Sequence, residues 1–330
     1  MGAQKFSGVT RTRLLAWIFF VVAIAFAIIA GISQETFYLR LATEALIFSG
    51  IALSVDLLLG YTGLFSLGQA LYFGMGAYLT ALLLLDDGGY GFWGALGVSL
   101  LVSTVVSLVI GAIAIRSRGV YFILITFGLA QVAGRAVYNT RSLGGSDGIT
   151  GIPVLDINFG LFSLNLGDPV SFFMLSLFFV LVMYLGLQYL THTPFGRVLI
   201  AIRSNEERVR ALGYNPWRYK LASYVIAADI AALAGTLYPL LRGFVSPELM
   251  YFDISVNAVI MVILGGTGTL IGPLYGSVFL IALKTFISSW TVHHGIVIGI
   301  IFMLTVIFFP AGFVGLYKRL VGRTKKGQSS

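Results

Sequence analysis

Long apolar stretches, separated by short polar ones, run along almost the whole chain of 330 residues. A helix that crosses a bilayer needs about 20 mostly apolar residues, so this pattern predicts an all-α, polytopic membrane protein with about ten transmembrane helices. The eighth stretch is too short to cross alone, and we expect a half-helix there or an extension outward from Asp253. The ten predicted spans are Leu14–Ile32, Leu41–Leu59, Leu64–Leu85, Phe92–Ile115, Val120–Val137, Val170–Leu190, Leu221–Leu241, Ile254–Leu264, Leu270–Trp290 and Gly295–Leu316.

The composition supports this class and excludes others. The chain is 58% hydrophobic and 10% charged, whereas soluble domains are about 25% charged. It contains no cysteine, which excludes disulfides, thiolate metal sites and cysteine nucleophiles. The net charge of +8 lies at helix ends and in loops, so it indicates topology and contact with membrane lipid rather than a nucleic-acid partner.

The distribution of Lys and Arg orients the chain. With the N-terminus in the cytoplasm, 16 of the 21 basic residues fall on the inner side and three on the outer side. The positive-inside rule therefore predicts an N-in, C-in protein with an even number of helices. The first span resembles a signal peptide, but its 19 apolar residues exceed a usual signal core, so we expect an uncleaved anchor. The three outer basic residues are Arg40, Arg141 and Arg242.

Two G-x-T-G turns, Gly60–Gly63 and Gly265–Gly268, each precede an outward-going helix on the predicted inner side. They suggest an internal duplication in parallel orientation, a common device in transporters. The alternative is that the glycines only let membrane helices pack closely.

The run Gly265–Gly272 lacks the Lys-Ser/Thr ending of a phosphate-binding loop. His293 and His294 are adjacent without a third ligand, so we expect no catalytic residue, cofactor or metal site.

The segment Thr191–Lys220 interrupts the apolar pattern and holds eight of the chain's 34 charges. Pro194 suits the first position of a short helix. A second short helix is expected from Asn205 to Leu212, with Ser204 and Glu207 forming a capping box and Gly213 ending it. The segment could lie on anionic lipid as an amphipathic helix. We favour protein docking, because Glu206 and Glu207 would repel lipid headgroups.

Polar and ionisable residues also occur within the predicted spans. A charge at a helix centre costs roughly 2.5–3.5 kcal/mol on insertion scales. Glu44, Arg135 and Lys284 are near enough to span ends to reach the interface, whereas Asp56 and Asp229 are expected to pair structurally or, alternatively, to serve an ion relay. Uncharged candidates for a translocation route, each of which could instead form only interhelical hydrogen bonds, are Gln69, Tyr72, Thr126 and Gln131.

Six ordered segments resemble the LivM-type permeases of branched-chain amino acid ABC importers, the LivH/LivM permease family. The resemblance covers about Leu41 to Leu320 and is weakest at the first span. The segments are GYTGLFSLGQALYFGMGAYLTALL, RGVYFILITFGLAQV, GGSDGITGIP, TPFGRVLIAIRSNEERVRALGYNPWRYKL, LAGTLYPLLRGFVSP and VILGGTGTLIGPLYG.

This resemblance implies a single transmembrane permease domain over residues 1–330, with residues 1–40 as an extra N-terminal span and residues 191–220 as a cytoplasmic coupling loop. The implied partners are a second, LivH-like permease, two cytoplasmic ATPases and a periplasmic substrate-binding protein at a bacterial inner (plasma) membrane. The chain would be a transporter subunit rather than an enzyme.

By the same resemblance, the segment Arg203–Gly213 is a coupling helix that docks on an ATPase. Only Ala211-Leu212-Gly213 matches the EAA signature of other importer permeases. The family carries branched-chain and other neutral amino acids, and also urea and short amides. An ion-coupled secondary carrier that uses Asp56 or Asp229 is a further alternative. The candidate coupling residues are Arg203, Asn205, Glu206, Glu207, Arg210 and Gly213.

Overall fold

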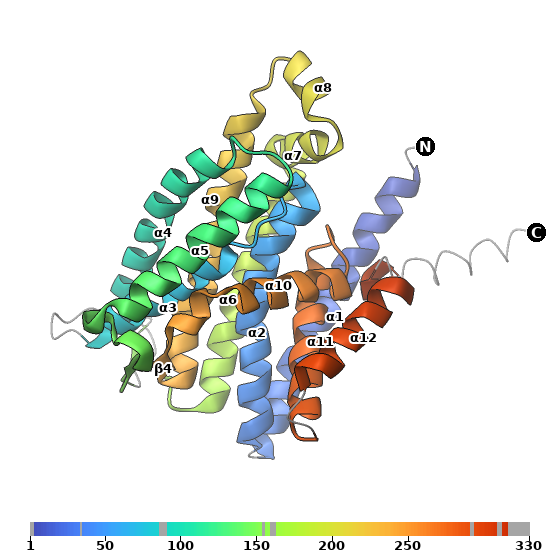
Figure 1. Cartoon of the computed structure of the whole chain (residues 1–330). Coiled ribbons are helices and arrows are strands. Elements are labelled where there is room, and N and C mark those ends of the chain that lie inside the picture. Colours follow the sequence, from blue (N-terminus) through green and yellow to red (C-terminus); the bar gives the residue numbers. More distant parts are fainter. Residues whose placement is uncertain are drawn as a thin grey trace, which may run out of the picture.

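Each of the ten predicted spans contains a helix in the computed structural model of the chain (Figure 1). The structure describes residues 3–33, 35–85, 91–153, 156–158, 163–290, 294–308 and 312–315. Within these ranges, seven helices are long and apolar enough to cross a membrane, and three apolar helices are shorter. The all-α, polytopic class is therefore confirmed.

Most helix ends lie within a few residues of the ends of the predicted spans. They are α1 (Ala3–Ile32), α2 (Thr36–Asp56), α3 (Gln69–Leu85), α4 (Phe92–Ala114), α5 (Val120–Asn139), α6 (Pro169–His192), α7 (Pro194–Ser204), α8 (Glu206–Ala211), α9 (Pro216–Arg242), α10 (Phe252–Gly265), α11 (Ile271–Ser288) and α12 (His294–Phe308). Short 3-10 turns lie at Arg141–Leu143, Gly145–Asp147 and Pro247–Met250, and a π-helical turn, Leu57–Thr62, extends α2.

The third predicted span begins later than the hydropathy indicates. Leu64–Gly68 is apolar but not helical, and α3 starts only at Gln69. Gly63 has a φ of 77°, which ends the π-helical turn in a left-handed conformation that favours glycine. The chain therefore folds back before α3 begins. The eighth segment is the short helix α10, as expected from its length.

Proline and capping residues fix several helix starts. Proline occupies the first turn of α6, α7 and α9, where its missing N–H has no helical partner to lose. Asp168 caps α6 by accepting from the backbone N–H of Ser171, and Asn215 caps α9 by accepting from that of Trp217. Hydrogen bonding to the side chain and backbone of Ser171 holds the pKa of Asp168 below its ordinary value.

Helix α9 packs against α2, α3 and α4 in the middle of the bundle. Small residues make this possible, because a side chain at Gly235 would clash with the backbone of Phe73, and one at Gly76 with that of Ala232. Close backbone approach between small residues is the usual means of packing membrane helices. The close-packing role of the glycines is therefore confirmed, while the internal duplication stays a prediction.

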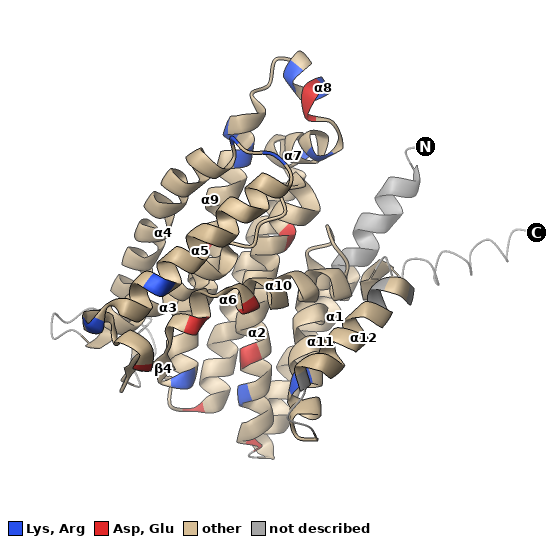
Figure 2. Cartoon of the chain, viewed as in Figure 1, with Lys and Arg blue, Asp and Glu red and all other residues tan. Residues whose placement is uncertain are grey.

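Short strands tie loops together at one end of the bundle. β1 (Ile149–Thr150) pairs antiparallel with β4 (Phe244–Val245), and β2 (Asp156–Asn158) pairs with β3 (Ser163–Asn165). At the opposite end, α7 and α8 stand beyond the bundle (Figure 1). Charged positions gather on α8 and near the other end, while most of the bundle between them is uncharged (Figure 2). The α7–α8 segment and the strand pairs therefore lie at opposite ends of the bundle, and the orientation of these ends in the membrane stays a prediction.

Candidate coupling site at the α7–α8 end

The tip of the α7–α8 segment is built by a side-chain cap. Asn205 has extended backbone angles (φ −163°, ψ 103°), and its Oδ1 accepts from the backbone N–H of Arg208 at 2.8 Å. The predicted cap at Ser204 is therefore wrong. Ser204 is still helical, so its hydroxyl donates to the Ile200 carbonyl at 2.9 Å. Gly213, with a φ of 88°, follows the end of α8 as expected.

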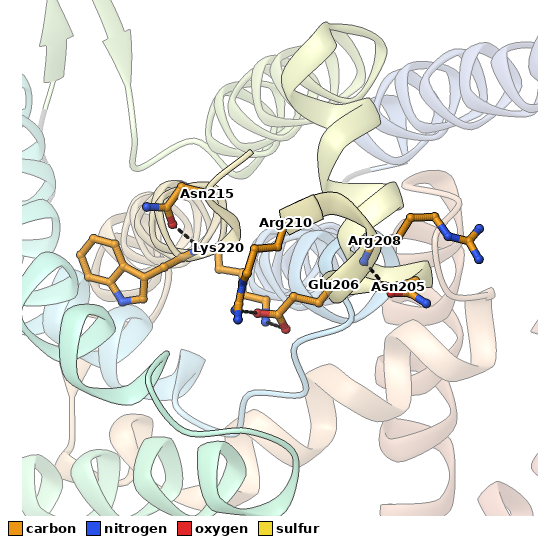
Figure 3. A network of polar contacts seen from close by, with 7 residues as sticks. Asn205, Glu206, Arg208, Arg210, Asn215 and Lys220 are labelled. Atoms are coloured by element: carbon orange, nitrogen blue, oxygen red, sulfur yellow. Dashed lines mark hydrogen bonds and ion pairs between the residues drawn. The ribbon is translucent and has the colours of Figure 1, made fainter. Parts of the chain in front are cut away.

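An ion-pair network holds α8 against the start of α9 (Figure 3). The carboxylate of Glu206 accepts from Lys220 Nζ at 2.6 Å and from Arg210 at 3.4 Å. Partial burial alone would raise the pKa of Glu206, but the hydrogen bond and charge of Lys220, with the charges of Arg118 and Arg210, outweigh it and lower that pKa. Glu206 is therefore a structural anchor as well as a charge.

The outer side of α8 is exposed. Val209 is buried, whereas Glu207, Arg208 and Arg210 are exposed. Leu212, just beyond the helix, exposes 71% of its surface. The tip therefore exposes charges of both signs together with the apolar side chain of Leu212.

Arg203, at the end of α7, reaches into the bundle. Its guanidinium donates to the Gly60 carbonyl in the first G-x-T-G turn. Asp56, one helical turn before Gly60, accepts from the backbone N–H groups of Gly268 at 2.6 Å, at the end of the second turn, and of Leu270 at 3.0 Å, just after it. These contacts form one unit, which we call the glycine clasp: Arg203, Asp56 and the turns Gly60–Gly63 and Gly265–Gly268. The clasp connects α7 to the segments that lead into α3 and α11.

The sequence did not predict the partners in the clasp. A structural role for Asp56 was expected, but its partners are backbone amides and not basic loop side chains. Asp229 likewise has a structural partner, because Thr104 Oγ1 lies 3.1 and 3.0 Å from its two carboxylate oxygens. The repeated G-x-T-G motif was the one signal that pointed to the two turns.

The four candidate route residues differ in burial and in hydrogen-bond partners. Gln69 is buried and its Oε1 accepts from Ser54 at 2.8 Å, while Tyr72 donates to the Tyr224 hydroxyl at 3.1 Å. Thr126 is buried and donates to carbonyls of its own helix. Gln131 is half-exposed. Their assignment to a translocation route stays a prediction.

The described ranges contain no group of three His, Cys, Asp or Glu side chains placed to hold a metal ion. His293 lies outside those ranges, as do residues 316–330 with their basic side chains. The fold and site thus define a multi-pass membrane protein with a capped, charged helical tip beyond the bundle.

Comparison with known proteins gives the family. Residues 37–306 match the family described as branched-chain amino acid transport system / permease component, so the chain belongs to this family. The high-affinity branched-chain amino acid transport system permease protein LivM of Salmonella typhimurium is 30% identical over 310 residues, which cover 88% of this chain and 72% of that protein. LivM of Escherichia coli is 28% identical, with 88% and 73% covered.

More distant relatives show the breadth of this architecture. The ribose import permease protein RbsC of Escherichia coli is 26% identical over 270 residues, which cover 79% of this chain and 77% of that protein. No solved structure matches the chain. The resemblance to LivM-type permeases that the sequence motifs predicted is confirmed.

Proposed function

We propose that this chain is one of two permease subunits of an ABC importer for branched-chain or other neutral amino acids. It would span a bacterial inner membrane with both termini in the cytoplasm. Its partners would be a LivH-like permease, two cytoplasmic ATPases and a periplasmic substrate-binding protein. The family match over residues 37–306 carries the proposal, and the exposed charged tip at α8 supports docking of an ATPase.

The proposed mechanism runs from α8 into the membrane. Movement of an ATPase would displace α8, which its Asn205 cap and its Lys220 ion pair hold as a rigid unit. Arg203 would pass this displacement to the glycine clasp, and hence to the segments that lead into α3 and α11. Such a rigid-body shift is a common way to alternate access between two sides of a membrane. No covalent step involves this chain.

The substrate is proposed from the named relatives. Both LivM proteins carry branched-chain amino acid transport in their names. The ribose permease shares the architecture with a different cargo, so the family match alone leaves urea and short amides as an alternative. A secondary carrier would need a titratable carboxylate on its ion route. The carboxylates of Asp56 and Asp229 accept hydrogen bonds from backbone amides and from Thr104, which supports structural roles for both.

Co-purification tests the assembly. The chain would be isolated from detergent-solubilised native membranes, the accompanying proteins identified and ATP hydrolysis measured. We expect a second permease and two ATPases, with hydrolysis stimulated by the binding protein and its substrate. A chain that purifies alone and takes up substrate in response to an ion gradient would contradict the proposal.

Charge reversal at the tip tests the coupling site. The variant Glu206→Lys/Glu207→Lys places two positive charges where the partner would meet negative ones. We expect ATP hydrolysis to lose its stimulation by substrate-loaded binding protein, and uptake in proteoliposomes to fall at least about tenfold, because like charges would then face each other across the interface.

Single variants separate docking from structural effects. Glu207 is exposed, so Glu207→Lys should impair coupling without breaking the Lys220 ion pair, and Glu207→Asp should retain coupling. Uptake by the double variant at the rate of the wild type would show that α8 is not the coupling helix.

A further inference from the structure

A cavity of about 240 Å³ opens at the end of the bundle opposite α8, between α2, α9, α10 and α11. Pockets for drug-sized ligands usually enclose roughly 300–1,000 Å³, so this cavity suits a smaller molecule, of the size of a single amino acid. Its lining residues fall into an apolar group and a polar group.

The apolar group forms a continuous wall. Phe48, Met261, Leu280 and Ile281 are almost fully buried, and Ile254 lies beside them. None of these side chains has a hydrogen-bonding group. Burial of aliphatic surface against such a wall stabilises a complex by roughly 0.8 kcal/mol per CH₂ group. The wall therefore suits a ligand with a branched aliphatic side chain.

The polar group carries charges of both signs. Lys284 is exposed, four residues before the end of α11, and within the described part of the chain it has no ion-pair partner. Glu44 accepts from Arg242 at 2.8 Å. Asn257, Thr285 and Ser288 add neutral hydrogen-bonding groups. Figure 2 shows charged positions of both signs in this lower part of the bundle.

These charges are a poor surface for lipid. Charged groups in membrane helices usually face the bundle interior or a water-filled cavity. Lys284 lies about 6 Å from the end of its helix at 1.5 Å per residue, which lets its ammonium group reach water at the mouth of the cavity. On the proposed topology, this mouth opens to the outer side.

We propose that the cavity is an outward-facing subsite for an α-amino acid with a branched aliphatic side chain. The Lys284 ammonium would bind the carboxylate of the ligand, and Glu44, shared with Arg242, would bind its ammonium group. The aliphatic side chain would lie on the wall formed by Phe48, Met261 and their neighbours. Urea and short amides lack the carboxylate that Lys284 requires. This inference rests on the proposed function and adds the residues that would bind its substrate.

Thiol protection tests occupancy directly. The natural chain contains no cysteine, so Thr285→Cys gives this subunit a single thiol in the cavity lining. Ser289→Cys is the matched control, because Ser289 is exposed near the same end of α11 but does not line the cavity. In membranes containing the complete transporter, we expect leucine to slow maleimide labelling of T285C severalfold and to leave S289C unchanged.

Two results of this labelling would overturn the proposal. In the first, leucine slows the labelling of neither thiol, or slows the labelling of both equally. In the second, acetamide or urea slows the labelling of T285C and leucine does not. The assay needs no ATP hydrolysis, so it reports on the subsite even if the chain worked without ATPases.

Transport kinetics provide the second readout. In proteoliposomes with the complete transporter, Lys284→Met should raise the KM for leucine about tenfold or more, since it removes one partner of an ion pair. Lys284→Arg retains the charge and should stay near the wild type. If the wild-type complex imports leucine while K284M keeps its KM and T285C is not protected, the subsite assignment fails and the importer assignment stands.

Discussion

At the scale of single residues, the carboxylate of Glu206 stabilises the exposed helix α8 through its ion pairs with Lys220 and Arg210. Its pKa lies below the ordinary 4.5, since Lys220, Arg118 and Arg210 together outweigh its partial burial. A carboxylate with a lowered pKa stabilises the fold fully above its unfolded pKa and loses this contribution as the pH falls through the folded pKa.

This sign gives a pH-dependent prediction. Above about pH 4.5, wild-type protein in detergent should have a higher melting temperature than Glu206→Gln. The difference should shrink as the pH falls below that value, because Glu206 becomes protonated and its ion pair with Lys220 is lost. Melting curves from pH 3 to 7 would measure it. Glu207→Gln is the control, and a gap for E206Q that is independent of pH would contradict the explanation.

Residue-level prediction from the sequence was partly correct at the tip. Both short helices were predicted, because Pro194 and Gly213 are strong local signals. The cap was misplaced by one residue, since Ser204 and Asn205 are both good caps and only the backbone decides which one leaves the helix first. The partner of Glu206 could not be predicted, because Lys220 is 14 residues away across a turn.

At the scale of elements, the glycine clasp depends on close approach of two backbones. A Cβ atom at Gly60 would lie 2.5 Å from the backbone nitrogen of Gly268 and 2.7 Å from its Cα. Backbone atoms cannot rotate away, so Gly60→Ala must separate the turns.

We therefore expect Gly60→Ala to destabilise the protein by about 1–3 kcal/mol, the usual range for overpacking, and to reduce uptake. Thermal unfolding in detergent and uptake in proteoliposomes would measure both. Gly97→Ala is the matched control on α4, where an added Cβ would have no atom within 4 Å. Equal effects of the two substitutions would show that the turns tolerate separation.

The elements themselves could be predicted well from hydropathy. Long apolar runs must form helices in a bilayer, because no other open structure satisfies the backbone there. The non-helical run Leu64–Gly68 was missed, since it is as apolar as its neighbours. The hydrogen bond between Asp56 and Gly268 was missed for another reason. It joins residues 212 positions apart, and a local sequence pattern holds no information about contacts over such a separation.

At the scale of the whole molecule, the two ends of the bundle should face opposite sides of the membrane. Thr150 is exposed in strand β1 and Ser204 is exposed at the end of α7. In intact spheroplasts, an impermeant maleimide should label Thr150→Cys. It should reach Ser204→Cys only after the membrane is opened.

Labelling of both thiols from the same side would contradict the predicted orientation. Because the chain has no cysteine of its own, each variant reports one position only. The structure places α8 and the β1–β4 pair at opposite ends of the bundle (Figure 1). The orientation of these ends was predicted entirely from the distribution of Lys and Arg, and this labelling would test it.

The long reach of the clasp has a consequence for how the protein is made. Asp56 enters the membrane early in synthesis, but the amide of Gly268 that it binds lies 212 residues further along the chain. At 5–20 residues per second, a ribosome needs roughly 10–40 s to supply that partner. Throughout this interval a growing chain carries a carboxylate without its final hydrogen-bond donors. Until Gly268 is synthesised, the hydrogen bonds of Asp56 have to come from water or from the insertion machinery.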